Sequence, residues 1–280
     1  MAATGRLYIV ATPIGNLGDV SARARDILQS VDLVAAEDTR VTRKLLDRFQ
    51  IRARMISYRE ANEVRAASKL VQHLQTGQSV ALVTDAGTPC ISDPGYRLVR
   101  AAAEAGIEIV SVPGPSSVIA LLSVSGLPTD RFSFEGFAPT KKAARRDALA
   151  TLCGCGRTVV FFESPRRVVA LLREIADTLS DPEVAVGREL TKLHEEVLRG
   201  KASQVATEIE KKTPRGEFAV AISIPANRSE CVESEAARTE IERLLDGGLS
   251  PRDIATVLKP AGVSRSAVYA VAAERPTSDE

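Results

Sequence analysis

The feature that most constrains the fold is an alternation of short apolar runs with longer amphipathic runs, which continues through the first 225 residues. The short runs are rich in β-branched residues and have the length of strands, whereas the longer runs carry the periodicity of helices. Strands that alternate with helices in this way form parallel βαβ units. The sequence therefore predicts an α/β protein whose sites lie where the strands end.

The first 120 residues predict a complete α/β lobe. Its strands are expected at Leu7–Ala11, Asp32–Ala36, Arg54–Ser57, Ser79–Thr84 and Glu108–Val112. Its helices are expected at Ser21–Val31, with Ser21 as N-cap, and at Thr42–Phe49, Ala61–Leu74, Tyr96–Ala105 and Ser116–Ser123. The pattern changes character near residue 120, which predicts a domain boundary there.

A second α/β lobe is predicted for residues 121–226. Its strands are expected at Arg131–Phe137, Arg157–Phe162, Glu183–Glu189 and Glu217–Ile224, and its helices at Lys141–Leu152, Arg166–Leu179 and Ser203–Lys211. The stretch Pro225-Ala-Asn-Arg-Ser-Glu is typical of a linker.

Residues 229–280 predict a small helical extension. A helix at Glu235–Leu245 precedes a helix, a glycine-containing turn and a second helix, with Ser250 and Ser264 as N-caps. This is the rhythm of a helix-turn-helix. The acidic residues of the extension outnumber the basic ones, however, which argues against a module that reads DNA.

Net charge is informative only when it is resolved along the chain. The 37 Lys and Arg residues nearly balance the 36 Asp and Glu residues, and this excludes a uniformly basic nucleic-acid coat. Between residues 138 and 175, in contrast, the sequence has eight basic residues and only three acidic ones. This stretch predicts a surface for RNA phosphates, unless it is simply a solvated helix face. The expected contacts are Lys141, Lys142, Arg145, Arg146, Arg166 and Arg167.

Histidine and cysteine usage gives no indication of a metal site. Two histidines are too few for a His-rich centre, and Cys153-Gly-Cys155 lacks the two-residue spacer of a zinc knuckle. No segment has the length of uninterrupted apolar residues that a membrane span needs, and no leader pattern precedes the first strand. We therefore expect no metal, no membrane contact, a cytoplasmic location and reduced cysteines at Cys90, Cys153, Cys155 and Cys231.

Three loops that follow predicted strands are rich in Gly and Pro. The first is Ala11-Thr-Pro-Ile-Gly-Asn-Leu-Gly-Asp, which lacks the glycine triplet of a dinucleotide-binding loop. The second is Asp85-Ala-Gly-Thr-Pro-Cys-Ile-Ser-Asp-Pro-Gly, and the third is Pro113-Gly-Pro-Ser-Ser. One such loop is often a plain surface turn, but three at one sheet edge favour a ligand site.

Six motifs in order carry a resemblance to a known family. They are Thr12-Pro-Ile-Gly-Asn-Leu-Gly-Asp, Ala36-Glu-Asp-Thr-Arg, the second and third loops above, Phe161-Phe-Glu-Ser-Pro-Arg-Arg and Gly187-Arg-Glu-Leu-Thr-Lys. The chain resembles the ribosomal RNA small-subunit methyltransferase I family, within the tetrapyrrole-methylase superfamily. The resemblance extends from about residue 5 to residue 225, and the C-terminal extension also resembles that of the family.

The resemblance implies two α/β lobes that bind S-adenosyl-L-methionine in the cleft between them, usually as a homodimer. It further implies methyl transfer to the ribose 2′-oxygen of a cytidine in the decoding region of 16S rRNA, with the small ribosomal subunit as partner. Carried over by position, the expected cofactor contacts are Pro13, Ala86, Gly87, Thr88, Ile91, Ser116, Ser117, Phe162, Glu163 and Leu190.

Methyl transfer to a hydroxyl requires a proton acceptor or a cation beside the developing oxyanion. Asp38, Arg40 and Glu163 are the expected catalytic residues, and Glu37 is a further candidate. Asp38 stands where related tetrapyrrole methylases carry a proposed proton acceptor, although those enzymes methylate carbon. The competing interpretation of Asp38 and Arg40 is an ion pair at a strand end. His194 is more readily interpreted as a structural or surface residue than as a base.

Two other functions remain open from the sequence. The first is a small-molecule methyltransferase that acts on a tetrapyrrole or precorrin and shares the fold and the cofactor. Such relatives open with a Val-Gly-x-Gly-Pro-Gly-Asp loop, which this chain lacks. The second is a ligand-sensing regulator that binds DNA through the C-terminal helices, and the acidic extension argues against it.

Overall fold

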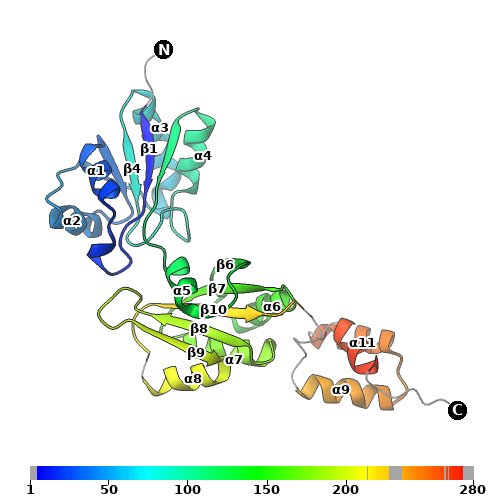
Figure 1. Ribbon diagram of the computed structural model, residues 1–280. Helices are drawn as coiled ribbons and strands as arrows, with labels where there is room; N and C mark the ends of the chain where they lie inside the picture. The colour runs from blue at the N-terminus through cyan, green and yellow to red at the C-terminus, as the bar shows by residue number, and fades with distance from the viewer. Residues whose placement is uncertain (1–4, 213, 227–234, 262, 264, 274–280) are drawn as a thin grey trace. The chain divides into compact units, whose positions relative to one another are not determined.

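The computed structural model describes residues 5–212, 214–226, 235–261, 263 and 265–273. The chain packs as two compact units. The first ends at Ala120 and also includes Leu190–Leu193, and the second contains Leu121–Glu189 and the chain from His194 onward. Figure 1 shows the order of their elements along the chain.

The first unit is built on a five-stranded parallel sheet. The strands run in the order β3-β2-β4-β1-β5, and every neighbouring pair is parallel. The central strands β2 and β4 are buried along their whole length, which is why their sequences are continuous apolar runs. The predicted α/β class is therefore confirmed. The bounds are β1 (Arg6–Val10), β2 (Leu33–Ala36), β3 (Met55–Ser57), β4 (Val80–Val83) and β5 (Glu108–Val112).

Helices cover both faces of this sheet, with α1 and α2 on one side and α3 and α4 on the other (Figure 1). Each face has its own apolar core. Leu28 and Leu46 pack on one face, and Leu70 and Leu98 pack on the other. The bounds are α1 (Ala22–Ser30), α2 (Thr39–Arg48), α3 (Glu63–Gln75) and α4 (Tyr96–Glu104), with 3₁₀ turns η1 (Leu17–Asp19) and η2 (Glu60–Asn62). The next helix, α5 (Ser117–Ser125), contains the division between the two units.

The N-cap of α1 was predicted from the sequence, whereas that of α2 was not. Ser21 caps α1 as predicted, because its hydroxyl accepts a hydrogen bond from the Ala24 backbone N–H at 3.0 Å. In contrast, α2 begins at Thr39, three residues before the predicted start. Its N-cap is Asp38, whose carboxylate accepts from the Arg40 N–H at 2.8 Å.

The second unit contains a mixed five-stranded sheet in the order β6-β7-β10-β8-β9. Only β6 and β7 are parallel, and the remaining neighbours are antiparallel. The strand β9 (Glu196–Lys201) was not predicted, because its charged sequence lies at a sheet edge and lacks a buried face. The other elements are β6 (Phe132–Phe137), β7 (Arg157–Glu163), β8 (Glu183–Arg188), β10 (Phe218–Ile224), α6 (Lys142–Leu152), α7 (Val168–Thr178) and α8 (Ala202–Lys211).

The C-terminal extension forms three helices around an apolar cluster of its own that includes Ile241, Ile254 and Val268. Ser250 caps the second of them as predicted, whereas Ser264, Cys231 and most of the predicted linker lie outside the described residues. The helices are α9 (Glu235–Asp246), α10 (Pro251–Leu258) and α11 (Arg265–Ala273), with a 3₁₀ turn η4 (Lys259–Ala261) between the last two. None of the described helices is long and apolar enough to cross a membrane.

Candidate functional site

The first two Gly/Pro-rich loops are joined by paired backbone hydrogen bonds at the carboxyl ends of β1 and β4. The Thr12 N–H donates to the Gly87 carbonyl at 2.9 Å, and the Gly87 N–H donates back to the Thr12 carbonyl at 3.1 Å. The Thr12 hydroxyl also donates to the Thr84 carbonyl at 3.0 Å. These hydrogen bonds hold close together three of the expected cofactor contacts, namely Pro13, Ala86 and Gly87.

The third loop is fastened to the other two. The Thr88 hydroxyl donates to the Pro115 carbonyl at 3.2 Å. A Cβ added to Gly114 would lie 2.9 Å from the Ala11 side chain, so only glycine allows this approach. The loop leads into α5, where Ser116 and Ser117 are half-buried. The three loops thus form one continuous edge of the first sheet.

Gly87 is buried, but few atoms lie on the side of its Cα where a Cβ would stand. Its φ of +82° is in the region that favours glycine, and an added Cβ would meet one described atom within 4 Å, the Ile14 Cγ2 at 3.6 Å. Ala86 and Ile91 are exposed on the same loop. The exposed apolar side chain of Ile91, beside a loop rich in backbone polar groups, suits a ligand that has both an aromatic ring and a polar tail.

Leu190 is buried and belongs to the first unit by its packing. Its carbonyl oxygen would lie 3.2 Å from a Cβ added to Gly15, and the Lys192 side chain would lie 2.3 Å away. The glycine in the first loop therefore lets the segment 190–193 approach. The structure places Leu190 beside the loop that carries Pro13.

Glu63, which sequence reasoning did not single out, fastens the far end of the second loop. Its Oε1 accepts hydrogen bonds from the Gly95 N–H at 3.1 Å, the Arg97 N–H at 3.4 Å and the Tyr58 hydroxyl at 3.1 Å. Burial raises the pKa of the neighbouring Cys90 thiol to about 11. The loop therefore rests on a buried polar cluster and carries a protonated thiol at neutral pH.

Asp38 and Arg40 pair with each other. The Arg40 Nη2 lies 2.6 Å from the Asp38 Oδ2, and the Arg40 side chain is 83% exposed. Hydrogen bonds from the Arg40 side chain and backbone hold the pKa of the Asp38 carboxyl well below its usual range. A carboxylate that already caps α2 and binds a guanidinium is a weak proton acceptor, which favours the ion-pair interpretation over the catalytic one.

Three other carboxyl groups gather at the ends of β2 and β4 and have raised pKa values. Burial raises the pKa of Glu37 and of Asp85, and it raises that of Asp93 to about 6, with the charge of Glu37 as a smaller cause. The Glu37 carboxylate accepts from the Asp85 N–H at 3.2 Å. A carboxyl group that titrates near neutrality is a better proton acceptor than Asp38.

Phe162 and Glu163 lie at the end of β7 in the second unit. The Phe162 ring packs against Phe134 and Phe137, with centroid distances of 4.7 and 5.8 Å. The Glu163 Oε1 is 2.6 Å from the Arg167 Nη2, whereas its buried Oε2 has no hydrogen-bond partner among the described residues. A buried acceptor without a partner is unusual in a native protein.

Arg145 is not an RNA contact in this structure, and that expectation was wrong. Its side chain is 7% exposed, and its guanidinium binds both oxygens of Glu174 at 2.6 and 2.8 Å. Its Nη1 also donates to the carbonyls of Pro139 and Thr140. Helical spacing explains this: Arg145 lies on the inner face of α6, four residues before the buried Leu149.

The other expected RNA contacts differ in their accessibility. Lys141, Lys142, Arg146 and Arg166 are exposed, whereas Arg167 is half-buried against Glu163. His194 is exposed. Among the described residues, no group of His, Cys, Asp or Glu side chains could hold a metal ion.

A cavity of about 230 Å³ lies within the first unit, between the first loop and α2. Asp85 lines it, and so does Thr42, whose hydroxyl is buried without a hydrogen-bond partner among the described residues. No sequence pattern distinguished Thr42 from an ordinary helical threonine. The full lining is Thr12, Pro13, Gly15, Leu17, Val41, Thr42, Lys44, Leu45, Thr84 and Asp85.

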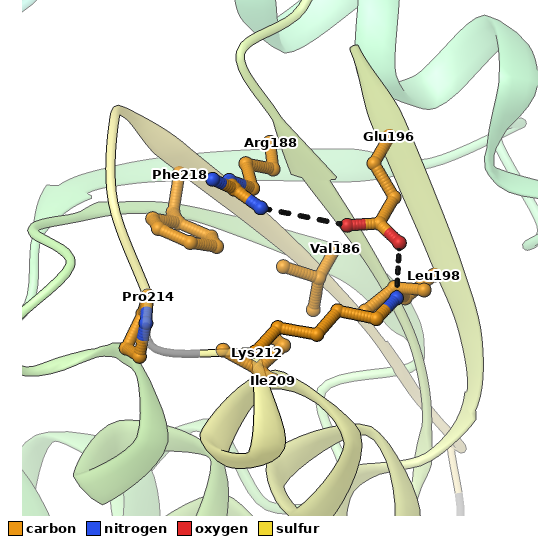
Figure 2. Close-up of a pocket in the computed structure, with 8 residues that line it drawn as sticks. All are labelled: Val186, Arg188, Glu196, Leu198, Ile209, Lys212, Pro214 and Phe218. Atoms are coloured by element: carbon orange, nitrogen blue, oxygen red, sulfur yellow. Dashed lines mark hydrogen bonds and ion pairs between the residues drawn. The ribbon is translucent and has the colours of Figure 1, made fainter. Parts of the chain in front are cut away.

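A second hollow, in the second unit, is too small for an organic ligand. Figure 2 shows Glu196 between Arg188 and Lys212 above an apolar floor, and both cations pair with its carboxylate. The volume of about 10 Å³ holds one water molecule at most. Its charges satisfy one another, so it has the features of a structural ion-pair cluster.

The chain is similar to known proteins over most of its length. Residues 6–206 match the family of tetrapyrrole (corrin/porphyrin) methylases. The ribosomal RNA small subunit methyltransferase I of Xylella fastidiosa is 44% identical over 96% of this chain and 99% of its own length. The protein of the same name from Escherichia coli O157:H7 is 42% identical over 97% of this chain and 96% of its own.

Solved structures show the same fold at lower identity. Cobalt precorrin-4 methyltransferase is 19% identical, with a TM-score of 0.58 over 78% of this chain and 94% of its own. The uroporphyrin-III-C-methyltransferase of Thermus thermophilus is 18% identical, with a TM-score of 0.55 over 82% of this chain and 100% of its own. At these identities the likeness concerns the fold alone. The curated relatives match almost the whole chain, and the chain therefore belongs to the ribosomal RNA small subunit methyltransferase I family of tetrapyrrole methylases.

Proposed function

We propose that the chain is an S-adenosyl-L-methionine-dependent methyltransferase that methylates the ribose 2′-oxygen of a cytidine in the decoding region of 16S rRNA. The observation that carries the proposal is likeness at 42–44% identity over 96–97% of the chain to proteins named ribosomal RNA small subunit methyltransferase I. That likeness spans the C-terminal helices as well as both α/β units. The enzyme would act on the small ribosomal subunit in the cytoplasm.

The joined loops of the first unit are the proposed cofactor site, and the hydrogen bonds that hold Thr12, Gly87, Thr88 and Pro115 together support this assignment. S-adenosyl-L-methionine would supply a methyl group already activated on a sulfonium. Within the first unit, the backbone of the loops would orient the cofactor, and Ile91 and Leu190 would offer apolar contact. The proposed holding residues are Pro13, Ala86, Gly87, Thr88, Ile91, Ser116, Ser117 and Leu190, together with Phe162 and Glu163 from the second unit.

Asp85 is the proposed proton acceptor for the ribose hydroxyl. Of the three carboxyl groups with raised pKa values, Asp85 is the one that lines the cavity beside the first loop. It is exposed and accepts a hydrogen bond from the Asp38 N–H at 3.0 Å, which orients its carboxylate. The role of Asp38 and Arg40 is then to fix the start of α2 and, through that backbone N–H, the position of Asp85.

RNA phosphates are proposed to bind the exposed cations of the second unit. Lys141, Lys142, Arg146 and Arg166 are accessible, and Arg146 is only loosely paired, 3.8 Å from Asp177. Contacts of this kind fix the position of an RNA without reading its sequence.

A homodimer is the proposed assembly. Phe132 and Phe137 lie on the edge strand β6 and are 43% and 58% exposed. Two exposed aromatic side chains on one edge strand are a liability in a monomer and support burial against a second copy.

The deciding experiment is methyl transfer from radiolabelled cofactor to small ribosomal subunits purified from cells that lack this activity. Label in 16S rRNA at a ribose 2′-oxygen is expected. Uroporphyrinogen III is offered in a parallel reaction, because the chain shares its fold with enzymes that methylate tetrapyrroles. Label in the tetrapyrrole and none in RNA would overturn the proposal.

A further inference from the structure

One wall of the cavity between the first loop and α2 belongs to the proposed cofactor loops, and the other wall belongs to α2, which the proposed cofactor site does not use. Its walls are largely apolar, with Pro13 and Leu17 on one side and Val41 and Leu45 on the other. At about 230 Å³ it is smaller than the roughly 300 Å³ at which pockets for drug-sized molecules begin. The cavity therefore has room for one flat ring.

Thr42 supplies a buried polar atom to this apolar space. The residue is 3% exposed, and its hydroxyl has no hydrogen-bond partner among the described residues. A buried hydroxyl without a partner is costly, and native proteins retain few of them. The oxygen itself has almost no accessible surface, but Thr42 lines the cavity, so a rotation of its side chain about χ1 would turn the hydroxyl toward a ligand that carries a hydrogen-bonding edge.

The exposed face of the same helix is basic. Arg40, Arg43 and Lys44 surround a shallow hollow next to the cavity, and Lys44 lines both. Arg43 is exposed, and Arg40 already pairs with Asp38, so Arg43 and Lys44 are the cations that are available for an anionic ligand. A row of cations beside a pocket for a flat ring matches a nucleic-acid strand, in which phosphates flank each base.

We propose that α2 binds the target nucleotide: the cavity takes its base, the Thr42 hydroxyl bonds the polar edge of that base, and Arg43 and Lys44 bind the flanking phosphates. This inference rests on the proposed function, because it assumes an RNA substrate. It assigns RNA binding to an element of the first unit, in addition to the cations of the second. Asp85, at the rim of the same cavity, would then meet the ribose of the seated nucleotide.

Three variants test the base cavity and the phosphate contacts separately. Thr42→Val keeps the shape of the side chain and removes the hydroxyl, and at least a tenfold loss of kcat/KM toward small subunits is expected. Leu45→Trp fills the cavity and should abolish transfer. Arg43→Glu with Lys44→Glu should weaken RNA binding and make its salt dependence shallower by roughly 0.7–0.9 for each phosphate that the protein no longer neutralises.

Matched controls exist on α3. Arg65→Glu with Lys69→Glu makes the same change of charge on exposed helical positions, and Val64→Trp adds the same bulk at an exposed apolar position. Both controls should behave as the wild type. Thermal unfolding confirms that each variant is folded, and Thr42→Val should be at least as stable as the wild type, because it removes an unpaired hydroxyl.

Binding of S-adenosyl-L-methionine, measured by calorimetry, shows whether the cavity holds an RNA base or the cofactor. All three α2 variants should bind the cofactor as the wild type does. If Thr42→Val or Leu45→Trp instead loses cofactor affinity, the cavity holds the cofactor and the inference is overturned. It is equally overturned if every α2 variant binds and methylates small subunits normally.

Binding to small subunits is measured apart from methyl transfer, so the two proposals can fail independently. A wild-type protein that binds them without transferring a methyl group would refute the proposed function, and the binding data would still decide the role of α2. If the wild-type protein methylates RNA and all α2 variants bind and methylate small subunits equally well, only the proposed role of α2 is refuted.

Discussion

Glu63 accepts a hydrogen bond from the Gly95 backbone N–H at 3.1 Å and so joins the start of α3 to the start of α4. The loop that ends at Gly95 is strained, because Cys90 and Ser92 have φ values of 73° and 63° although neither is glycine. A Cβ at Gly95 would lie 2.5 Å from the Cys90 sulfur, so the chain closes tightly there. The carboxylate of Glu63 is the group that holds this strained loop in place.

Glu63→Gln should weaken cofactor binding and destabilise the protein. The amide oxygen can keep the donors that bind Oε1, but it is a weaker acceptor than a carboxylate, and the NH₂ group would replace Oε2 and face the Arg97 Nε, which lies 3.4 Å from that oxygen. Hydrogen bonds to a charged acceptor contribute about 1.5–3 kcal/mol each, so a loss of about 2 kcal/mol in the free energy of unfolding is expected. Calorimetry with S-adenosyl-L-methionine and urea unfolding measure the two effects, and Glu60→Gln, at an exposed position, is the control. Unchanged cofactor affinity would show that the loop does not depend on Glu63.

Arg145→Ala should reduce stability, because Arg145 is buried in an ion pair with Glu174 and is not available to RNA. It leaves Glu174 buried without its partner, which typically costs about 3–5 kcal/mol. Arg145→Met with Glu174→Leu removes both charges and should recover most of that loss. The free energy of unfolding in urea is the measurement, and Arg146→Ala, on the exposed face of the same helix, should change it little. Equal stability of the Arg145 and Arg146 single variants would contradict the structural role.

The sequence predicted the first sheet well because its signals are local. Continuous apolar runs such as Val80–Val83 occur where a strand is buried on both faces, and the Gly/Pro loops mark their ends. The edge strand Glu196–Lys201 could not be predicted in this way, because it has no fully buried residue and its sequence shows no apolar alternation. Its formation depends on pairing with β8, which is a tertiary interaction.

The candidate site was predictable in its loops but less so in its side chains. Glycine and proline spacing identified the segments around Gly87 and Gly114 that the structure joins. The spacing of charges along α6 did not reveal that Arg145 points inward, because a basic residue at that position is unusual in a core. Thr42 and Asp93 carry no local signal at all, since their properties arise from burial and from groups distant in sequence.

Asp93→Asn should stabilise the protein at neutral pH and have little effect in acid. The pKa of Asp93 is raised to about 6 in the folded protein, above its ordinary value of 3.8. Between these two values the folded state binds more protons than the unfolded state, so stability falls as pH rises through this range. Asparagine cannot ionise, and its advantage should therefore be small at pH 4 and largest above pH 6. Thermal unfolding at both pH values measures it, and Asp26→Asn, on the exposed face of α1, is the control. A stabilisation equal at both pH values would contradict the assigned titration.

Lys141→Glu with Lys142→Glu should weaken binding to small ribosomal subunits without changing cofactor affinity. Both side chains are exposed at the start of α6, so their reversal does not disturb a core. The logarithm of the binding constant falls with the logarithm of salt concentration by roughly 0.7–0.9 per neutralised phosphate, and the variant should reduce the slope by about one to two such steps. Filter binding over a series of salt concentrations measures this. Lys211→Glu with Lys201→Glu, at exposed positions at the two ends of α8, makes the same change of charge elsewhere in the second unit. If that control lowers the slope as much as the α6 variant does, the effect belongs to net charge, and α6 carries no specific contact with RNA phosphates.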